Sequence, residues 1–413
     1  VIETRLLNMV LKKFNLFTHL AALKKFMLLG QGDFVTCLMD TVGGELKRRA
    51  NQLFRHNLTG LLDGALRSCN AQFEPAYVLD RLGVRLLEPS PGDSGWEVFS
   101  LDYAIDPPLA AVIHAEAVSK YRIAFHMLWR LKRVEWALSG AWRNLFTFHH
   151  TRGHFYLSKL KPILHRCAIE RGKMTHFINS LNNFLMFEVV ETAWVKLVAG
   201  IEQASCLDDI IACHDAYLED IQERALLSEE HEGLNMQIQL VLQAILRFCN
   251  LEETMVGDAL SVAARKRHEG PIGWCGKPKS SEDGQSSMQV TIATNSVAGT
   301  VDGVPGYIIA RLEEAAQDYE KQFDKMLLIL QQQGEKCGHL MRFLTFRLDL
   351  DGANAGQRAA SWGGDNDETK SNHSMGATSS MSVNVNTSVG QSMTVAQHKV
   401  RTPPKLKSSI QQR

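Results

Sequence analysis

The sequence lacks a CxxC cysteine pair, an excess of charge of either sign and a long uncharged apolar run. Its eight cysteines are scattered, which argues against a disulfide scaffold or a common zinc motif and favours reduced thiols in the cytosol. Lysine plus arginine equals aspartate plus glutamate, at 45 each in 413 residues, so no net field favours nucleic acid or an anionic membrane. Without an apolar run of about 18 residues, no membrane-spanning helix is expected. Partners of this chain must therefore be selected by shape.

Complete phosphate-binding motifs are also missing. The stretch LLGQGDFVTCLMD at 28–40 has two glycines, but no third glycine, no preceding strand and no Lys-Ser/Thr pair. The residues before it, HLAALKKFMLL, have helical rather than strand periodicity. We therefore expect Gly30 to end this helix in the left-handed conformation and Asp33 to cap the next helix. The sequence predicts no bound cofactor.

No set of residues indicates catalysis or metal binding. His149, His150 and His154 cluster, but no cysteine or carboxylate stands at ligand spacing, so a polar interhelical loop is the preferred interpretation. Two acid pairs adjoin predicted helix ends, where the helix dipole favours negative charge; they are Asp208 with Asp209 and Glu229 with Glu230. We expect Asp208 to be an N-cap, and we predict that the chain is not an enzyme.

Long amphipathic helical patterns dominate the rest of the chain. They cover 109–138, 173–194, 207–227, 234–266, 306–333 and 337–347, and Pro108 suits the first turn of the helix that would begin at 109. Residues 84–103 contain two short apolar arms around a Ser-Pro-Gly-Asp-Ser-Gly cluster, which predicts a small hairpin or a packed loop. The predicted fold is all-α, with elongated stacked helical bundles and one small extended element.

Two segments have the composition of disordered chain. Residues 267–305 lack large apolar side chains and helical periodicity, so we expect a disordered insertion that divides a folded region at 1–266 and 306–350. Residues 351–413 turn to Gly, Ala, Ser, Asn and Thr and end in the basic KVRTPPKLKSSIQQR, which predicts a disordered tail. Serines in this tail are either phosphorylation sites or parts of a solvated segment; composition favours neither. Because the chain begins with Val1 inside a helical pattern, we expect it to be part of a longer protein.

Six motifs occur in a set order along the folded region. They are GQGDF at 30–34, NLTGLL at 57–62, SPGDSGWEVFSLDY at 90–103, FHMLWRLKRVEW at 125–136, MTHFINSLNNFLMFEVVETAW at 174–194 and FLTFRLDL at 343–350. This set resembles the C-terminal half of the gamma-tubulin complex proteins, the family of Spc97 and Spc98. SPGDSGW and LWRLKRVE are similar to the component-three, or Spc98-like, members.

The resemblance implies a function that spacing and composition do not reveal. In this family the C-terminal half holds one gamma-tubulin molecule, the N-terminal half packs against neighbouring members, and component three pairs with the Spc97-like component two. The resulting ring templates microtubules at spindle poles and other microtubule-organising centres. By resemblance, motif-loop residues lie at or support the gamma-tubulin surface; the candidates are Gln31, Asp33, Asp93, Trp96, Arg347 and Asp349.

Three alternatives remain at the level of sequence. The six residues could instead cap and pack helices without contacting any partner. The chain could be a helical scaffold or tethering subunit unrelated to tubulin, built from similar bundles. It could also be a nucleotide-dependent enzyme that uses the glycine loop, although its motif is incomplete.

Overall fold

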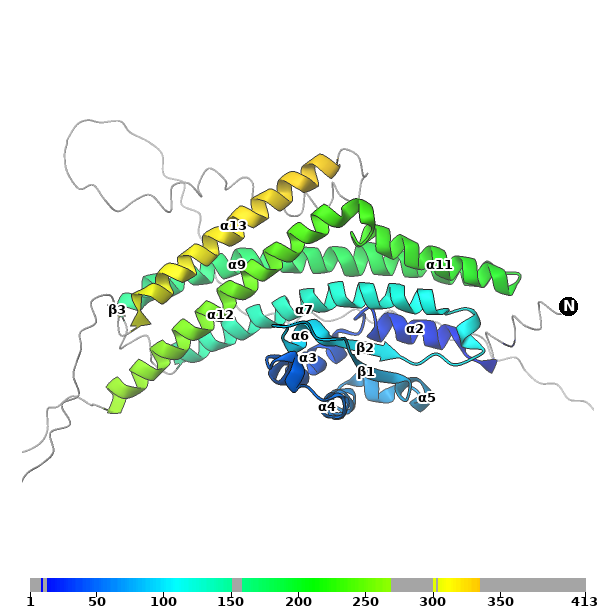
Figure 1. The fold of residues 1–413 in the computed structure, drawn as a ribbon, viewed down its shortest axis with the longest axis horizontal. Helices are drawn as coiled ribbons and strands as arrows, with labels where there is room; N and C mark the ends of the chain where they lie inside the picture. Colours follow the sequence, from blue (N-terminus) through cyan, green and yellow to red (C-terminus); the bar gives the residue numbers. More distant parts are fainter. Residues whose placement is uncertain (1–8, 10–12, 151–157, 269–299, 302–303, 335–413) are drawn as a thin grey trace, which may run out of the picture. The chain divides into compact units, whose positions relative to one another are not determined.

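The computed structural model describes residues 9, 13–150, 158–268, 300–301 and 304–334. The first part of the chain forms short helices and a hairpin (Figure 1). Its elements are α2 (Leu16–Phe26), α3 (Gly32–Leu46), η2 (Ala50–Gln52), α4 (Arg55–Ser68), η3 (Asn70–Phe73), α5 (Ala76–Leu79), β1 (Leu82–Leu86), α6 (Gly95–Val98) and β2 (Phe99–Tyr103). Here η marks a helix other than α: η2 and η3 are 3₁₀ turns.

The extended element predicted at 84–103 is confirmed as an antiparallel hairpin. Leu82 pairs with Tyr103 and Leu86 with Phe99, and the intervening loop contains the short helix α6. Leu82 and Val84, two apart in β1, both face the core and are buried, as expected for a strand with one packed face. The hairpin packs its β2 strand against the long helix that follows it.

Long helices make up the rest of the described chain. They are α7 (Ala115–His150), α9 (Lys161–Asn183), α10 (Thr192–Gln203), α11 (Leu207–Arg224), α12 (Glu232–His268) and α13 (Gly306–Gly334), with η4 (Leu109–Ala111), η5 (Ser158–Leu160), the π-helical η6 (Phe184–Glu191), η7 (Glu229–His231) and the short strands β3 (Thr300–Val301) and β4 (Val304–Pro305). Helix α12 packs against both α13 and α7, and α7 packs against α9 (Figure 1). The all-α helical bundle prediction is confirmed.

Aromatic side chains fill the core where the hairpin meets α7. Trp129 is buried between Phe99 at 4.9 Å and Phe125 at 5.6 Å between ring centroids. Within the first part of the chain, Phe26 of α2 meets Phe34 of α3 edge to face, with ring centroids 5.0 Å apart. Burying such rings contributes about 2 to 3 kcal/mol each, so this cluster fixes the first part of the chain on the long helices.

Some predicted boundaries differ from the structure. The helix expected from Leu109 forms only the 3₁₀ turn η4, and α7 begins at Ala115, although Leu109, Val112 and Ile113 are buried as the pattern required. Burial selects apolar residues whether or not the backbone is helical, so periodicity alone misplaced this start. Most of 267–305, the helix expected at 337–347 and the tail at 351–413 lie outside the described residues; α12 extends to His268 and β3 and β4 lie near the end of the expected insertion.

Candidate partner-binding surface

The GQGDF motif forms the junction between α2 and α3. The residue in the left-handed conformation is Leu29, with φ of 52°, so the prediction for Gly30 was wrong. Gly30 is required for a different reason: its N–H donates to the carbonyl oxygen of Lys24 at 3.2 Å, and a Cβ added to it would lie 2.9 Å from that oxygen. Close approach of two backbone segments, rather than a positive φ, therefore explains this glycine.

Asp33 does not cap α3. Gln31 is the N-cap, and Asp33 lies in the first turn, where its carboxylate accepts a hydrogen bond from the backbone N–H of Asn70 at 2.9 Å. Desolvation acts to raise the pKa of Asp33, but hydrogen bonds from Asn70, Phe34 and Gln31 outweigh it and lower the pKa below its ordinary value. The carboxylate occupies the N-terminal turn of α3, the position that a phosphate-binding loop would keep for its anion. This geometry favours a role in positioning the chain.

The turn held by Asp33 presents an exposed aromatic side chain. Phe73 is the last residue of η3 and is 80% exposed. The turn is held on both sides, because Asn70 is bound by Asp33 and Glu74 forms an ion pair with Lys25 of α2. Sequence reasoning missed Phe73; the available signal was a lone aromatic in NAQFEP, outside any helical period and two residues before Pro75.

The second motif loop lies before β2. The carboxylate of Asp93 accepts the Ser90 N–H at 2.8 Å, and its carbonyl accepts the Ala50 N–H at 3.0 Å, which fixes the turn. Trp96 is buried, with its ring centroid 5.7 Å from that of Trp129. Asp93 thus shapes a partly exposed turn, whereas Trp96 belongs to the core beneath it.

The structure does not bring all six sequence candidates together. Gln31 and Asp33 lie at the start of α3. The backbone around Asp93 instead contacts Arg48 and Ala50, which follow the end of α3. A helix of 15 residues is roughly 22 Å long, so these loops form two separate surfaces. Arg347 and Asp349 lie outside the described residues.

The motif at 174–194 contacts α2 through charged and aromatic side chains. Lys24 Nζ donates to the carboxylate of Glu191 at 2.7 Å and lies 4.9 Å from the centre of the Trp194 ring. Glu191 ends the π-helical segment η6, and Phe187 within that segment is 62% exposed. Segments of π-helix occur frequently at functional positions, and nothing in the residue pattern indicated this one. The helix before GQGDF is therefore tied to the motif at 174–194.

Other residues singled out in the sequence have structural roles. Asp209, not Asp208, binds the backbone N–H groups of Ser205 and Cys206 at the start of α11. The hydrogen bond from the Ser205 hydroxyl, followed by those from the two backbone N–H groups, lowers the pKa of Asp209 to about 2. The prediction that Asp208 is the N-cap was wrong: the N-cap is Cys206, and Asp209, three residues later, completes a capping box. Both acids lie in the first turn, where the helix dipole favours negative charge.

Within the described residues, the histidines, cysteines and carboxylates do not form a metal site. The described residues contain no group of three or more His, Cys, Asp or Glu placed to hold a metal ion, and the six cysteines among them are free. The side chains of His149 and His150, and all of His154, lie outside what is described.

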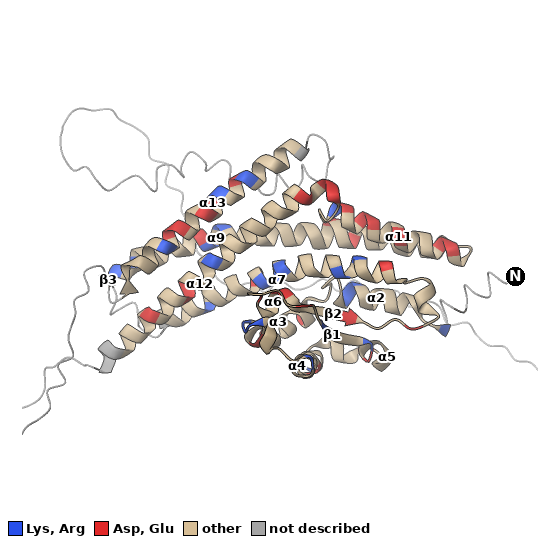
Figure 2. Ribbon diagram, in the orientation of Figure 1, with Lys and Arg blue, Asp and Glu red and all other residues tan. Residues whose placement is uncertain are grey.

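No described helix is long and apolar enough to cross a membrane. Charges of both signs occur along α12 and α13 (Figure 2).

The family model for the gamma tubulin complex component C-terminal region matches residues 16–352. The chain belongs to this family. The match begins at α2, spans all the long helices and includes the six ordered motifs, so the resemblance read from those motifs is confirmed.

Individual members of the gamma-tubulin complex component family give the same result. The gamma-tubulin complex component 3 homolog of Xenopus laevis is 36% identical over 353 residues, which cover 84% of this chain. The human gamma-tubulin complex component 3 is 35% identical over 358 residues, again 84% of the chain. The spindle pole body component alp6 of Schizosaccharomyces pombe is 40% identical over 266 residues, or 63% of the chain. The matched regions cover 37%, 37% and 32% of these relatives, so this chain spans less than half of their length.

Proposed function

We propose that this chain binds gamma-tubulin as a subunit of the gamma-tubulin complex and thereby supports microtubule nucleation. The observation that carries the proposal is the family match over 16–352, together with relatives named as component 3 and as a spindle pole body component. Those names also agree with a location in the cytoskeleton, at microtubule-organising centres and spindle poles.

The proposed partners are proteins. Gamma-tubulin is the first, and the Spc97-like component two and other complex components are the second group. The charge of the whole chain is balanced, and α12 and α13 carry charges of both signs, which does not favour nucleic acid (Figure 2). The relatives are named as complex components, which supports a role without catalysis.

The turn around Phe73 is the best-defined contact candidate on this chain. A partner contact gains most from an aromatic side chain that is exposed when free and held rigidly, since little entropy is lost on binding. Phe73 meets both conditions, because its turn is anchored at Asn70 and at Glu74. In this proposal Gln31 and Asp33 support the contact from the α2–α3 junction.

The second motif loop offers a smaller contact. The turn at Asp93 is partly exposed, and Trp96 supports it from below without reaching the surface. Arg347 and Asp349 remain candidates on the strength of their motif alone.

A titration with GTP-loaded gamma-tubulin tests this proposal. The unaltered chain should bind, and Phe73→Ser should weaken binding by at least about tenfold, or ~1.4 kcal/mol. Ile169→Ser is the matched control, since Ile169 is 50% exposed on α9 and belongs to no motif loop. Unchanged affinity of Phe73→Ser would remove this turn from the interface, and unchanged affinity of Arg347→Glu would remove Arg347. Failure of the unaltered folded chain to bind would overturn the function itself.

A further inference from the structure

A small pocket lies where the hairpin loop meets α7 and α12. Its volume is about 130 Å³, which holds one side chain rather than a whole drug-sized ligand. Arg130 and Gln243 line the pocket and are exposed, so solvent reaches it from their side. The lining residues that determine its chemistry are Glu97, His126, Trp129, Arg130, Arg133 and Gln243.

Several hydrogen-bond donors of these lining residues have no acceptor within the part of the chain that the structure describes. Among them are the guanidinium of Arg130, the amide of Gln243 and the indole Nε1–H of Trp129. Trp129 is 1% exposed, so its Nε1–H is closed to bulk water. Buried donors normally have a partner, and this one indicates an acceptor that the described chain does not supply.

The one carboxylate among the lining residues is already engaged. Glu97 accepts hydrogen bonds from Arg133 at 2.6 Å and from the backbone N–H of Ser94 at 3.0 Å. The guanidinium of Arg133 also lies over the Trp96 ring, 5.4 Å from its centre. Arg133 and Glu97 therefore balance each other, and the positive charge of Arg130 has no counterpart among the lining residues.

Positive charge extends along α7 on the same face. Arg122, His126 and Arg130 follow one another at intervals of four residues, which places them side by side on a helix. Neither arginine forms an ion pair within the described residues. Burial lowers the pKa of His126, and Arg130 and Arg122 lower it further, so the neighbouring charges that act on this side chain are positive.

Exposed apolar side chains stand one helical turn from the pocket on both long helices. Ile123 of α7 is 47% exposed and precedes His126 by three residues. Met236 of α12 is 57% exposed and precedes Gln239, another lining residue, by the same interval. Leu240, the next residue after Gln239, is 39% exposed. A partner that reaches the pocket would therefore cover apolar groups beside a positive charge.

We propose that this pocket binds an aspartate or glutamate side chain of a partner protein, in a segment that carries apolar residues next to the acid. The carboxylate would accept hydrogen bonds from the Arg130 guanidinium, which can donate two parallel N–H groups to it. The Gln243 amide and the Trp129 ring lie on the same wall. One unpaired guanidinium with neutral donors matches the single charge of a carboxylate better than the double charge of a phosphate.

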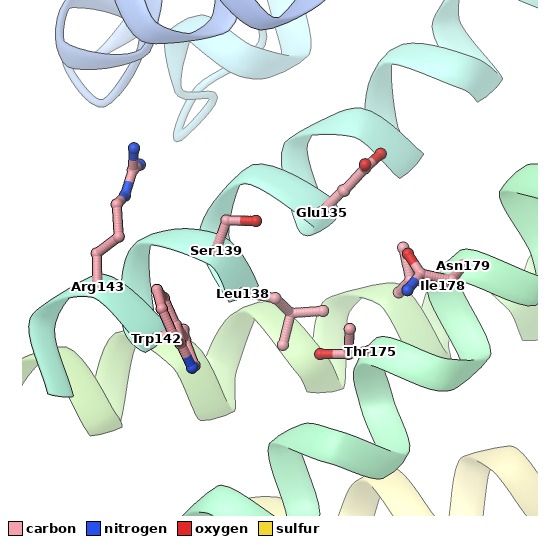
Figure 3. A pocket seen from close by; sticks show the side chains of 8 residues that line it. All are labelled: Glu135, Leu138, Ser139, Trp142, Arg143, Thr175, Ile178 and Asn179. Atoms are coloured by element: carbon pink, nitrogen blue, oxygen red, sulfur yellow. The ribbon is translucent and has the colours of Figure 1, made fainter. Parts of the chain in front are cut away.

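A larger pocket between α7 and α9 lacks this arrangement of charge (Figure 3). Its volume is about 440 Å³, and Arg143, the arginine among its lining residues, points away from it and lies 4.0 Å from Asp40. Glu135, which also lines it, is paired with Lys132 at 2.8 Å. Arg143 is exposed on the same helix as Arg130 and so provides a matched control position.

Isothermal titration of the full chain with two short peptides tests the proposal. The probes are acetyl-Gly-Leu-Glu-Glu-Leu-Gly-amide and the same peptide with glutamine in place of both glutamates. The glutamate peptide should bind at least about fivefold tighter at about 50 mM salt, and the difference should shrink at about 300 mM. Equal affinities, or no binding of the glutamate peptide to a folded chain at about 10 mM, would overturn the proposal. Tighter binding of inorganic phosphate would overturn it in favour of a free anion.

Substitutions on α7 locate the bound acid. Arg130→Gln should weaken the glutamate peptide at least about fivefold, whereas Arg143→Gln should leave its affinity unchanged. Both side chains are exposed, so the helical circular dichroism of both variants should match that of the unaltered chain. Equal losses in the two variants would show that general surface charge attracts the acid and would contradict the pocket.

The tryptophan side chains give a second readout. In a chain with isotope-labelled tryptophan, the indole N–H resonance of Trp129 should shift on addition of the glutamate peptide, and the shift should be lost in Arg130→Gln. Shifts confined to other tryptophans would overturn the proposal. Gamma-tubulin is absent from these experiments, so their outcome is independent of the proposed function.

Discussion

The carboxylate of Asp33 and the backbone N–H of Asn70 lie 2.9 Å apart and join the start of α3 to the turn that follows α4. A motif that reads in sequence as a glycine loop therefore acts as a connection between segments 37 residues apart. The aromatic ring presented by this connection, Phe73, stands between its two anchors.

Asp33→Ala should loosen this turn and weaken the fold slightly. Loss of one hydrogen bond to a carboxylate is expected to cost about 1 to 2 kcal/mol in urea unfolding. Because the pKa of Asp33 is lowered in the folded chain, its contribution is present above the unfolded pKa of about 4 and is lost as pH falls through the folded pKa. Asp63→Ala, at an exposed position of α4, is the control. Equal stability of the two variants at neutral pH would contradict the role given to Asp33.

Glu252→Ala should be severely destabilising. Glu252 is 1% exposed and forms an ion pair with Arg171 of α9, which is also buried, so its removal leaves an uncompensated buried charge. The expected loss is about 3 to 5 kcal/mol in denaturant unfolding. The neighbouring Glu253 forms only an exposed pair with Lys47 at 3.5 Å, and Glu253→Ala should change stability by less than about 1 kcal/mol. The double variant Arg171→Met, Glu252→Leu should recover most of the loss; if it does not, packing rather than the unpaired charge explains the effect.

Gly95→Ala should destabilise the hairpin loop. A Cβ at this position would lie 2.5 Å from Leu53 Cδ1 and 2.9 Å from the backbone of Leu46, and the Gly95 N–H is bound to the carbonyl of Arg48. We expect a loss of about 1 to 3 kcal/mol, as for overpacking in a core. Gly60→Ala, in α4, has open space around the added methyl group and should be neutral or stabilising by up to about 1 kcal/mol. Thermal unfolding of the two variants, compared side by side, measures the difference.

His214 should make the fold sensitive to mild acid. It is fully buried and hydrogen-bonded to the Tyr121 hydroxyl at 3.1 Å. Burial lowers its pKa to about 4, although Asp215 acts in the opposite direction. A lowered histidine pKa means that the unfolded chain binds the proton better, so stability falls as pH drops from about 6.5 toward 4. The loss in free energy of unfolding caused by His214 between pH 6.5 and 4 is on the order of 3 kcal/mol.

The His214 prediction is checked by urea unfolding at a series of pH values. His214→Gln removes the titration, so its stability should fall less steeply between pH 6.5 and 4 than that of the unaltered chain. Parallel pH profiles would show that other groups cause the acid dependence, for example His126, whose pKa burial also lowers.

The sequence indicated the helices and the hairpin because both depend on local patterns. Apolar residues recur with a period near 3.6 along α7, α12 and α13, and the turn cluster before Phe99 is recognisable without any tertiary information. The family resemblance rested on motifs in order and needed no geometry.

The candidate surface depended on contacts between distant segments, which single-sequence patterns do not reveal. The hydrogen bond from Asn70 to Asp33, the ion pair of Lys24 with Glu191 and the exposure of Phe73 all follow from packing. Gly30 was assigned to the end of a helix on local grounds, but its role is the close approach to Lys24. Trp96 was expected to lie at or support the gamma-tubulin surface; it is buried, and its supporting role stays a prediction.

The most direct measurement of the central claim is the mass of the species formed when this chain and GTP-loaded gamma-tubulin are mixed and separated by size at moderate salt. A single peak with the mass of a one-to-one complex is the predicted result. Two separate peaks, from a chain shown by circular dichroism to be helical, would contradict the claim that this chain binds gamma-tubulin.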